Sequence, residues 1–349
     1  MASTSTDVFV VGGGPAGLAA AIAARLRGFD VTVADAAQPP IDKACGEGLM
    51  PDSLSALRRL GIELDPERSF AFRGIRFIGD GGRVAADFRR EAGVAVRRVH
   101  LHQGMIDRAE ELDVKLLWRT RVTGIADGAV WLDDRRVQSR YIVGADGERS
   151  RVRRWANLDA VHNESFRYGF RRHYRVRPWT RFMEIYWGPG SQMYVTPVGG
   201  GESCVALITR DPHVRLEAAL VSFPELAQKL QGAPAIGEER GAITATRRLR
   251  RIYRRNAVLV GDASGSVDAI TGEGISLAFR QALALADALA AGDLAAYQAA
   301  HRRMRRRPAC MARLMLMLDR FPRLRPHVLR AFAAEPAIFE RLLAVHAGV

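Results

Sequence analysis

The sequence of 349 residues predicts an α/β fold, in which a parallel βαβ sheet is interrupted by a mainly antiparallel sheet and followed by C-terminal helices. Three observations predict it. A β-branched run at 8–11 leads through a glycine-rich turn into an alanine-rich helix. Two later apolar strands end in Asp146 and Asp262. Between them, segments such as 182–187 and 192–198 alternate in polarity, which is typical of antiparallel strands with one wet face.

The first unit has the spacing of a Rossmann-like dinucleotide-binding motif. Gly12, Gly14 and Gly17 fit G-x-G-x-x-G between a strand and a helix that runs on to Gly28. A second strand ends at Asp35, 21 positions after Gly14, where an acid can bind a ribose hydroxyl. The first glycine permits the tight turn, the second lets the backbone approach a pyrophosphate, and the third lets the helix pack closely on the sheet. The helix start adds free N–H groups and partial positive charge.

Two further segments repeat this pattern. Residues 140–154 read RYIVGADGERSRVRR, where a strand ends before Asp146 and Ser150 is a predicted helix cap. Residues 256–278 read NAVLVGDASGSVDAITGEGISLA, where a buried strand ends near Asp262 and a glycine-bracketed loop opens a long helix. The carboxyl ends of parallel strands form the crevice where open α/β sheets bind ligands, so both aspartates are candidate cofactor ligands.

The order of these segments predicts discontinuous domains. We expect a cofactor domain from 1–66, 92–160 and 250–300, a substrate domain from 67–91 and 161–249, and C-terminal helices over 301–349. The inserted sheet would then cover the reactive end of the cofactor.

Composition excludes several classes of protein. With 48% hydrophobic and 26% charged residues, the chain has enough apolar surface to fold. The three cysteines are too far apart to indicate a disulfide framework or a zinc site, so we expect no metal. The short polar start does not resemble a secretory signal, and no apolar run approaches the length that spans a membrane, which together predict a cytoplasmic protein.

The net charge of +14 comes mostly from arginines spread along the chain, and no nucleic-acid motif accompanies them. We therefore expect no nucleic-acid partner. One local feature differs: the basic run 301–307 directly precedes the apolar segment 311–318. This region is a candidate for peripheral contact with a membrane surface, and a packed terminal helix is the alternative.

Together these motifs resemble the FAD-dependent oxidoreductases of the p-hydroxybenzoate hydroxylase fold. The resemblance covers about residues 7–300 and rests on the glycine motif with Asp35, A-D-G-x-x-S-x-V-R at 145–153, and G-D-A at 261–263. The segments K-A-C-G-E-G-L at 43–49 and T-G-E-G-I at 271–275 look most like the geranylgeranyl reductase branch. The W-x-W-x-I-P motif of flavin-dependent halogenases is absent, which argues against halogenation.

The resemblance implies a set of FAD contacts. It assigns the pyrophosphate to the glycine loop, the adenosine ribose to Asp35, and the flavin ring to the two loops at 43–46 and 272–275. Arg98, before a predicted helix, would turn toward the phosphates, and the backbone of Val122 would contact adenine. The full set of implied cofactor residues is Gly12, Gly14, Pro15, Ala16, Gly17, Asp35, Lys43, Cys45, Gly46, Arg98, Val122, Asp146, Asp262, Gly272, Gly274 and Ile275. No second G-x-G-x-x-G is present, so NAD(P)H or a protein would serve as a transient reductant.

The expected reaction is oxidation–reduction of an apolar or aromatic small molecule, such as a polyketide, phenol or isoprenoid. A flavin monooxygenase is the first expectation, since the hydroxylase fold favours oxygen chemistry. A reductase of carbon–carbon double bonds, like geranylgeranyl reductase, is the alternative, and a non-catalytic prenyl or lipid carrier with the same fold is a third.

Three residues are candidates for catalysis: Glu47, His173 and Tyr194. Glu47 lies between two glycines of the 43–49 loop, where it can bind substrate or make a loop hydrogen bond. Histidine suits proton transfer near neutral pH, although His173, flanked by Arg172 and Tyr174, has the pattern of a solvated strand residue. Tyr194 can donate a hydrogen bond to a substrate oxygen or pack in its strand.

Overall fold

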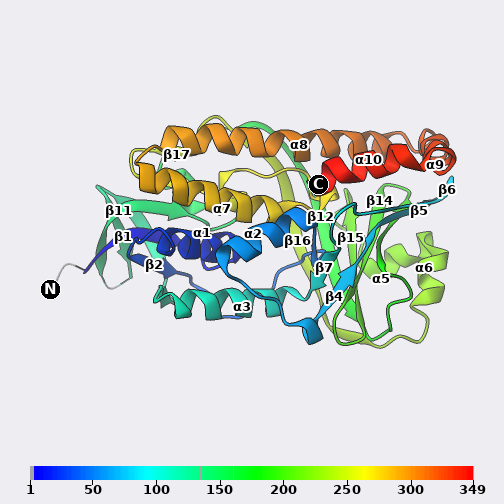
Figure 1. The fold of residues 1–349 in the computed structure, drawn as a ribbon, viewed down its shortest axis with the longest axis horizontal. Coiled ribbons are helices and arrows are strands. Elements are labelled where there is room, and N and C mark those ends of the chain that lie inside the picture. Colours follow the sequence, from blue (N-terminus) through cyan, green and yellow to red (C-terminus); the bar gives the residue numbers. More distant parts are fainter. Residues whose placement is uncertain (1–3, 134, 160, 349) are drawn as a thin grey trace.

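The computed structural model describes residues 4–133, 135–159 and 161–348. The parallel sheet forms one end of the molecule and the larger antiparallel sheet the other, with helix α8 running along both (Figure 1). The predicted α/β class is confirmed, including the inserted sheet and the C-terminal helices.

The first sheet has the strand order β17-β18-β11-β1-β2-β8. Strand β10 also pairs with β11, and β9 pairs with β10. Strand β17 and the β9–β10 pair are antiparallel, and the other pairings are parallel. Its strands are β1 (Thr4–Val11), β2 (Val31–Ala34), β8 (Lys115–Leu117), β9 (Val122–Ala126), β10 (Ala129–Leu132), β11 (Arg136–Gly144), β17 (Tyr253–Arg254) and β18 (Ala257–Leu259).

The register of this sheet brings the three sequence motifs together. Val11 pairs with Gly144, Gly144 with Leu259, and Val11 with Ala34. The strands therefore end in line, and the residues that follow each end meet at one edge of the sheet, where open α/β sheets bind ligands.

Helices cover this sheet and connect its strands. They are α1 (Pro15–Arg25), α2 (Pro51–Leu60), α3 (Arg98–Glu111), α4 (Arg151–Trp155) and α7 (Gly274–Ala291). Helix α1 ends three residues before Gly28, which takes φ +86° in the following turn rather than closing the helix directly. Helix α7 packs against α1, α2 and α8. By length and composition α7 could cross a membrane, which the sequence analysis did not anticipate, but 61% of it is buried inside the protein.

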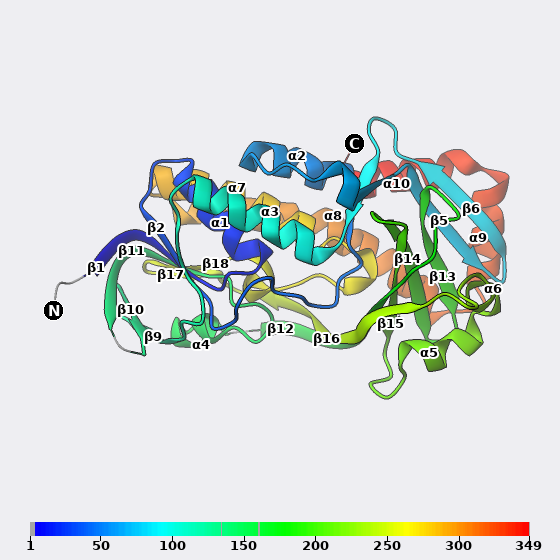
Figure 2. The same ribbon diagram turned by 90° about the horizontal axis from the view of Figure 1, so that it is seen from below.

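The second sheet has the order β16-β12-β15-β14-β13-β5-β6. All its neighbours are antiparallel except β13 and β5. The long strands β12 and β16 reach from this sheet toward the parallel one (Figure 2). The strands are β5 (Gly74–Gly79), β6 (Gly82–Asp87), β12 (Val161–Tyr174), β13 (Phe182–Gly188), β14 (Ser191–Val198), β15 (Glu202–Thr209) and β16 (Ala235–Leu249).

Smaller elements complete the fold. A three-stranded sheet has the spatial order β3-β7-β4, with strands β3 (Gly48–Leu49), β7 (Gly93–Val96) and β4 (Ser69–Phe72). Two short helices, α5 (Leu216–Ala219) and α6 (Pro224–Lys229), follow β15, and 3-10 turns occur at Pro66–Arg68, Leu220–Ser222, Gly261–Ser264 and Ala269–Thr271.

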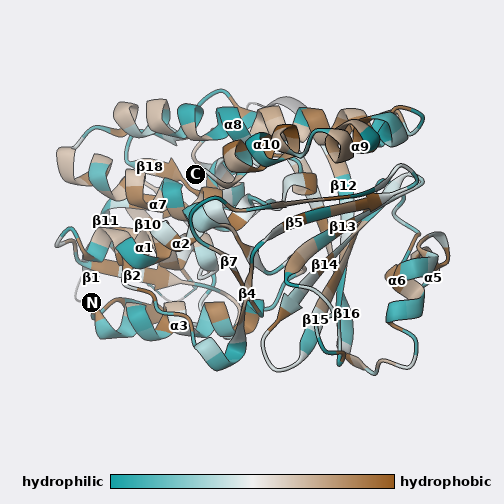
Figure 3. Ribbon diagram, turned by 45° about the vertical axis from the view of Figure 1, so that its right-hand side comes forward, coloured by the Kyte–Doolittle hydropathy of each residue, from teal (hydrophilic) through white to brown (hydrophobic). Residues whose placement is uncertain are grey.

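The C-terminal helices are α8 (Leu294–Arg320), α9 (Arg325–Ala334) and α10 (Pro336–Ala347). Helix α8 begins at Leu294, upstream of the expected boundary at 301, because Asp293 caps it through the backbone N–H groups of Ala295 and Ala296. Apolar residues recur along β5, β13 and β14 and along α8 to α10 (Figure 3). They form a second hydrophobic core between the sheet and these helices, separate from the core of the parallel sheet.

Candidate functional site

Two of the three glycines in the loop, Gly12 and Gly17, are in close packing contacts, and the third, Gly14, borders an open space that we call the cradle. A Cβ at Gly12, where φ is +109°, would lie 2.5 Å from the carbonyl oxygen of Ala145, and one at Gly17 would lie 1.8 Å from the carbonyl oxygen of Gly12. A Cβ at Gly14 would meet nothing within 4 Å, and Gly14 lines the large cavity. Gly14 is also the N-cap of α1, with Pro15 in the first turn and no side-chain cap. The free N–H groups therefore face open space that an anionic group can fill.

The flavin-facing loops of the resemblance show the same openness. A Cβ at Gly46, Gly272 or Gly274 would meet nothing within 4 Å, and all three line the same cavity as Gly14. Four separate glycines thus border one space into which side chains would otherwise project. The residues present fit a bound dinucleotide, because backbone can approach such a ligand closely only where Cβ atoms are absent.

Charged residues surround this cradle. Asp262 is accessible from the cavity and enclosed by protein elsewhere, so burial raises the pKa of its carboxyl, while Lys43 and Arg98 oppose that rise. Pro15, Ala16, Cys45 and Ile275 line the same cavity. Arg98 is the first residue of α3 rather than preceding the helix, because the helix includes most of the segment expected to lead into it.

Three predicted cofactor residues have roles that their sequence pattern did not indicate. Asp35 accepts hydrogen bonds from the backbone N–H groups of Gly13 at 2.7 Å and Ala37 at 2.8 Å, which orient its carboxylate at the end of β2. The carboxylate of Asp146 caps α4, accepting from Ser150 Oγ and from the N–H groups that follow it. Ser150 itself is confirmed as the N-cap. Val122 is buried in β9, and neither it nor Asp35 lines the cavity.

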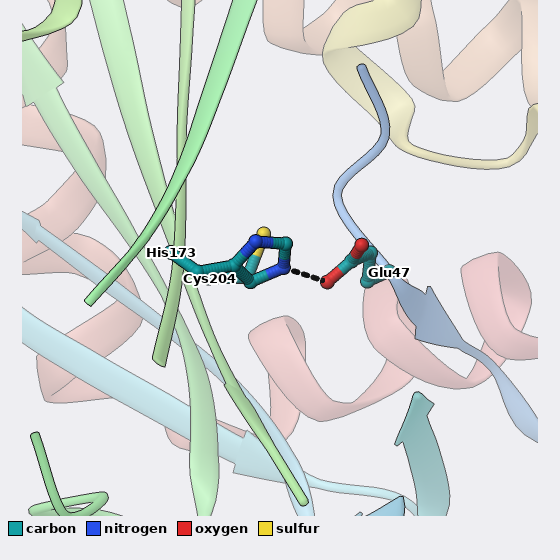
Figure 4. A group of neighbouring side chains, drawn as sticks. All are labelled: Glu47, His173 and Cys204. Atoms are coloured by element: carbon teal, nitrogen blue, oxygen red, sulfur yellow. Dashed lines mark hydrogen bonds and ion pairs between the residues drawn. The ribbon is translucent and has the colours of Figure 1, made fainter. Parts of the chain in front are cut away.

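Glu47 and His173 form a buried pair (Figure 4). Glu47 is 3% exposed with φ +60°, and one carboxylate oxygen accepts from the N–H of Arg98 at 3.0 Å. The other lies 2.7 Å from His173 Nε2. Burial raises the pKa of Glu47, but the hydrogen bond from His173 and the charge of Arg171 outweigh it and hold that pKa below its usual value. The expectation of a solvated His173 is wrong: it is 1% exposed, because this part of β12 faces the 43–49 loop.

The protonation of His173 follows from its two partners. Arg171 Nη1 lies 3.0 Å from His173 Nδ1, and a guanidinium can only donate. We therefore assign Nδ1 as acceptor and Nε2–H as the donor to Glu47, which makes His173 neutral. His173 thus holds the Glu47 carboxylate in place through this hydrogen bond.

Cys204 completes a group of three potential metal ligands in the described residues. Its sulfur and the nearest atoms of Glu47 and His173 lie within 4.8 Å of one another. Burial raises the pKa of the Cys204 thiol well above its usual value, which keeps it protonated, and Arg171 places a positive charge beside the group. These features favour a hydrogen-bonded network over a cation site.

Tyr194 joins the substrate sheet to the flavin-facing loop. Its hydroxyl donates a hydrogen bond of 2.6 Å to the carbonyl oxygen of Ile270, and burial raises its pKa. The proton is thus held by a backbone carbonyl, so Tyr194 is placed to position the 269–275 loop. A buried ion pair supports the same loop, since Arg167 contacts both Asp268 and Asp319 at 3.0 Å.

The cavity has a volume of about 1510 Å³ and extends from the cradle into an apolar compartment. Single ligands usually occupy about 300–1,000 Å³, so the space suits a cofactor together with a substrate. One row of side chains crosses the sheet in register, namely Phe77, Ile185, Tyr194 and Ala206. Across from it, the C-terminal helices contribute Met315, Leu318, Phe332, Phe339, Leu342 and Leu343.

Two polar residues of the substrate sheet face away from this compartment. Glu184 and Tyr186 alternate with the cavity-lining Met183 and Ile185, and they form a buried cluster with Lys229 of α6. The sequence analysis did not identify Glu273 or His346, which both line the cavity.

Comparison with known proteins agrees with this geometry. The chain matches the family described as FAD binding domain over residues 5–299. It is 30% identical over 321 residues to a menaquinone reductase of Mycobacterium tuberculosis (strain H37Rv), covering 83% of this chain and 78% of that protein. It is 27% identical over 295 residues to digeranylgeranylglycerophospholipid reductase 1 of Methanothermobacter thermautotrophicus, covering 78% and 74%.

Solved structures share the fold. The flavin-dependent brominase Bmp2 aligns with a TM-score of 0.84 at 20% identity, covering 99% of this chain and 94% of that one. A geranylgeranyl bacteriochlorophyll reductase-like protein of Thermoplasma acidophilum aligns with a TM-score of 0.72 at 21% identity, covering 99% and 92%. The glycine cradle, the aligned strand ends and the family match lead to one conclusion: this chain belongs to the FAD-binding domain family and is an FAD-dependent oxidoreductase.

Proposed function

We propose that this protein reduces a carbon–carbon double bond in a lipid with an isoprenoid tail, such as a prenylated quinone. The observation that carries the proposal is the apolar compartment that opens directly from the cofactor cradle. Its walls consist of aliphatic and aromatic side chains from β5, β13 and the C-terminal helices, a lining that matches a long hydrocarbon chain.

FAD, when bound, supplies the two-electron chemistry of the reaction. The residues of this chain bind and orient the reactants. The glycine loop and Asp262 hold the cofactor, Tyr194 and Arg167 fix the 269–275 loop, and the apolar walls exclude water from the reacting end.

The sequence relatives support a reductase. Their names describe reductases of menaquinone and of geranylgeranyl lipids, and the match extends over most of each protein. The brominase shares only the fold at its level of identity. Hydroxylation with molecular oxygen, the first expectation from the sequence, is therefore the alternative. The experiment below must distinguish it from reduction of a double bond.

We further propose that the protein works in the cytoplasm against a membrane surface, from which it takes its substrate. Met317, Phe321 and Leu324 are exposed at the end of α8 and before α9. Arg313, Arg320 and Arg323 are exposed among them. Apolar side chains surrounded by arginines suit an anionic lipid interface. NAD(P)H or a protein partner would serve as the transient electron donor.

The test uses the FAD-loaded protein reduced with dithionite under anaerobic conditions and mixed with menaquinone-4. The product is re-oxidised in air, which returns any quinol to the quinone, and is then measured by mass spectrometry. We expect a quinone heavier by two hydrogens, with fragments that place both hydrogens in the isoprenoid tail. The Asp262→Ala variant should lose FAD on gel filtration because a polar contact to the cofactor is removed. Free reduced FAD without protein is the second control, and it should give no product reduced in the isoprenoid tail. A parallel reaction under ¹⁸O₂ with NADPH tests the alternative: a product containing ¹⁸O, without anaerobic reduction, would reject the reductase.

A further inference from the structure

Helix α10 presents one histidine to the cavity. Its cavity-lining residues are Phe339, Leu342, Leu343 and His346, spaced as one helical face. The first three continue the apolar wall, and His346 is the polar residue at its end. His346 lies outside the region that matches the FAD-binding family, which ends at 299.

His346 meets Glu273 of the flavin-facing loop. Glu273 is 3% exposed, lines the cavity between Gly272 and Gly274, and has no hydrogen bond to either carboxylate oxygen in the described part of the chain. Its Oε2 lies 3.4 Å from His346 Nδ1, which is also enclosed and lacks a hydrogen bond. A buried carboxylate without a hydrogen bond is costly, and the His346 ring is placed to become the partner of Glu273.

The arginines near this pair, Arg280 and Arg307, form ion pairs with a different carboxylate, that of Asp52. Asp52 of α2 accepts from Ser276 at 3.0 Å and from Arg307 of α8 at 3.2 Å, and it forms an ion pair with Arg280 of α7 at 3.5 Å. Burial raises the pKa of Asp52, these arginines lower it, and Glu273 adds to the rise. Both arginines therefore pair with Asp52, and the basic side chain that contacts Glu273 in the described residues is the His346 ring, at 3.4 Å.

We propose that His346 is a catalytic proton donor for the double-bond reduction, and that Glu273 positions its ring; this rests on the proposed reductase function. Nδ1–H would face Glu273, leaving Nε2, which is not among the enclosed atoms, to face the substrate. The π bond breaks and two C–H bonds form. Bound reduced FAD would supply two electrons and one hydrogen as hydride, and the N–H of His346 would supply the other hydrogen as a proton, which solvent would then replace.

The first test measures the rate of tail reduction in single turnovers of menaquinone-4 by the reduced, FAD-loaded protein between pH 5.5 and 9. Quenched samples are re-oxidised in air, and the hydrogens gained by the isoprenoid tail are counted by mass spectrometry. His346→Gln should slow reduction at least about 100-fold, the size typical of lost general acid catalysis. It should also abolish the fall in rate with rising pH, because neutral imidazole has no spare proton to donate. Glu273→Gln should slow the reaction less and shift the pH profile. In His346→Ala, added imidazole should restore part of the rate.

Matched controls are available on the same helical region. His327→Gln on α9 and Glu340→Gln on α10 change exposed residues of the same types and should leave the rate within twofold. The dissociation constant for menaquinone-4, measured from the spectrum of oxidised FAD, should change less than threefold in His346→Gln. An unchanged rate in that variant, or loss of binding in place of rate, would overturn the assignment.

A second readout does not depend on turnover. Diethylpyrocarbonate should modify His346 in the FAD-loaded protein, and menaquinone-4 should protect it, with the exposed His327 modified equally in both samples. Modification is mapped by peptide mass spectrometry. Absence of protection would reject the contact between His346 and substrate. Wild-type protein that protects His346 but yields no reduced product would instead reject the reductase function.

Discussion

Alanine substitutions at Gly14 and at Gly17, made one at a time, should have different effects. One should weaken cofactor binding and the other should destabilise the fold. In Gly17→Ala the new Cβ would lie 1.8 Å from the carbonyl oxygen of Gly12, so α1 must move by about 1.6 Å to reach an ordinary 3.4 Å contact. Overpacking of this kind costs about 3 kcal/mol. Helix propensity alone would favour alanine by about 1 kcal/mol, so net destabilisation would be specific to the clash.

Gly14→Ala should behave in the opposite way. Gly14 has φ −72° and ψ 178°, which alanine adopts freely, and nothing lies within 4 Å of the new methyl group. The free energy of unfolding of the apoprotein should change by less than about 1 kcal/mol. The methyl group would occupy the cradle, and losing charge-assisted contacts of about 3 kcal/mol would weaken FAD binding about 100-fold.

The assay is urea unfolding of both apoproteins, followed by titration with FAD monitored by quenching of flavin fluorescence. Wild-type FAD affinity in Gly14→Ala would refute the identification of the cradle. Equal destabilisation by the two substitutions would refute the division of roles within the loop.

Three further predictions concern charge and surface. Arg167→Met removes the buried arginine that pairs with both Asp268 and Asp319 and should cost about 3–5 kcal/mol in urea unfolding. Arg210→Met removes the second arginine at Asp319, at a side chain 51% exposed, and should cost less than about 1 kcal/mol; equal costs would contradict the buried network. Burial lowers the pKa of His301 to about 3, so the unfolded chain binds a proton that the folded one does not between about pH 6.5 and 3. Stability should therefore fall as pH falls through that window, and His301→Gln should flatten the slope by about 1.4 kcal/mol per pH unit, which unfolding curves at several pH values would test. Phe321→Ser should reduce cosedimentation with vesicles containing anionic lipid, while Val221→Ser, at the 85% exposed control position, should not; no difference between them would exclude the α8–α9 membrane surface.

The cofactor half of the site could be predicted because it depends on backbone geometry that local sequence specifies. Gly12 needs a positive φ and Gly17 needs contact without a Cβ, and both needs appear directly as glycine in the chain. The adjacency of Asp146 and Asp262 followed from parallel strands ending at one edge.

The substrate half of the site depends on which distant segments pack against one another. The sequence of a single segment does not specify such contacts. His173 has charged and polar neighbours in sequence, yet the 43–49 loop buries it. The 339–346 face of α10 was visible as a helical repeat ending in histidine, but nothing in that repeat indicates that it meets Glu273, 73 positions away. A search for apolar helical faces that carry one titratable residue could have identified His346 as a candidate.

The wall of the apolar compartment supplied by α8 to α10 lies mostly beyond residue 299, where the family match ends. Under the proposed function, the flavin-binding loops and this wall of the lipid compartment are encoded in consecutive stretches of the gene. A ribosome completes the flavin-binding loops before it has made the helices that close the compartment. Exchange of the last helices would therefore remodel one wall of the compartment, while the flavin-binding loops and the opposite wall on the sheet are inherited unchanged.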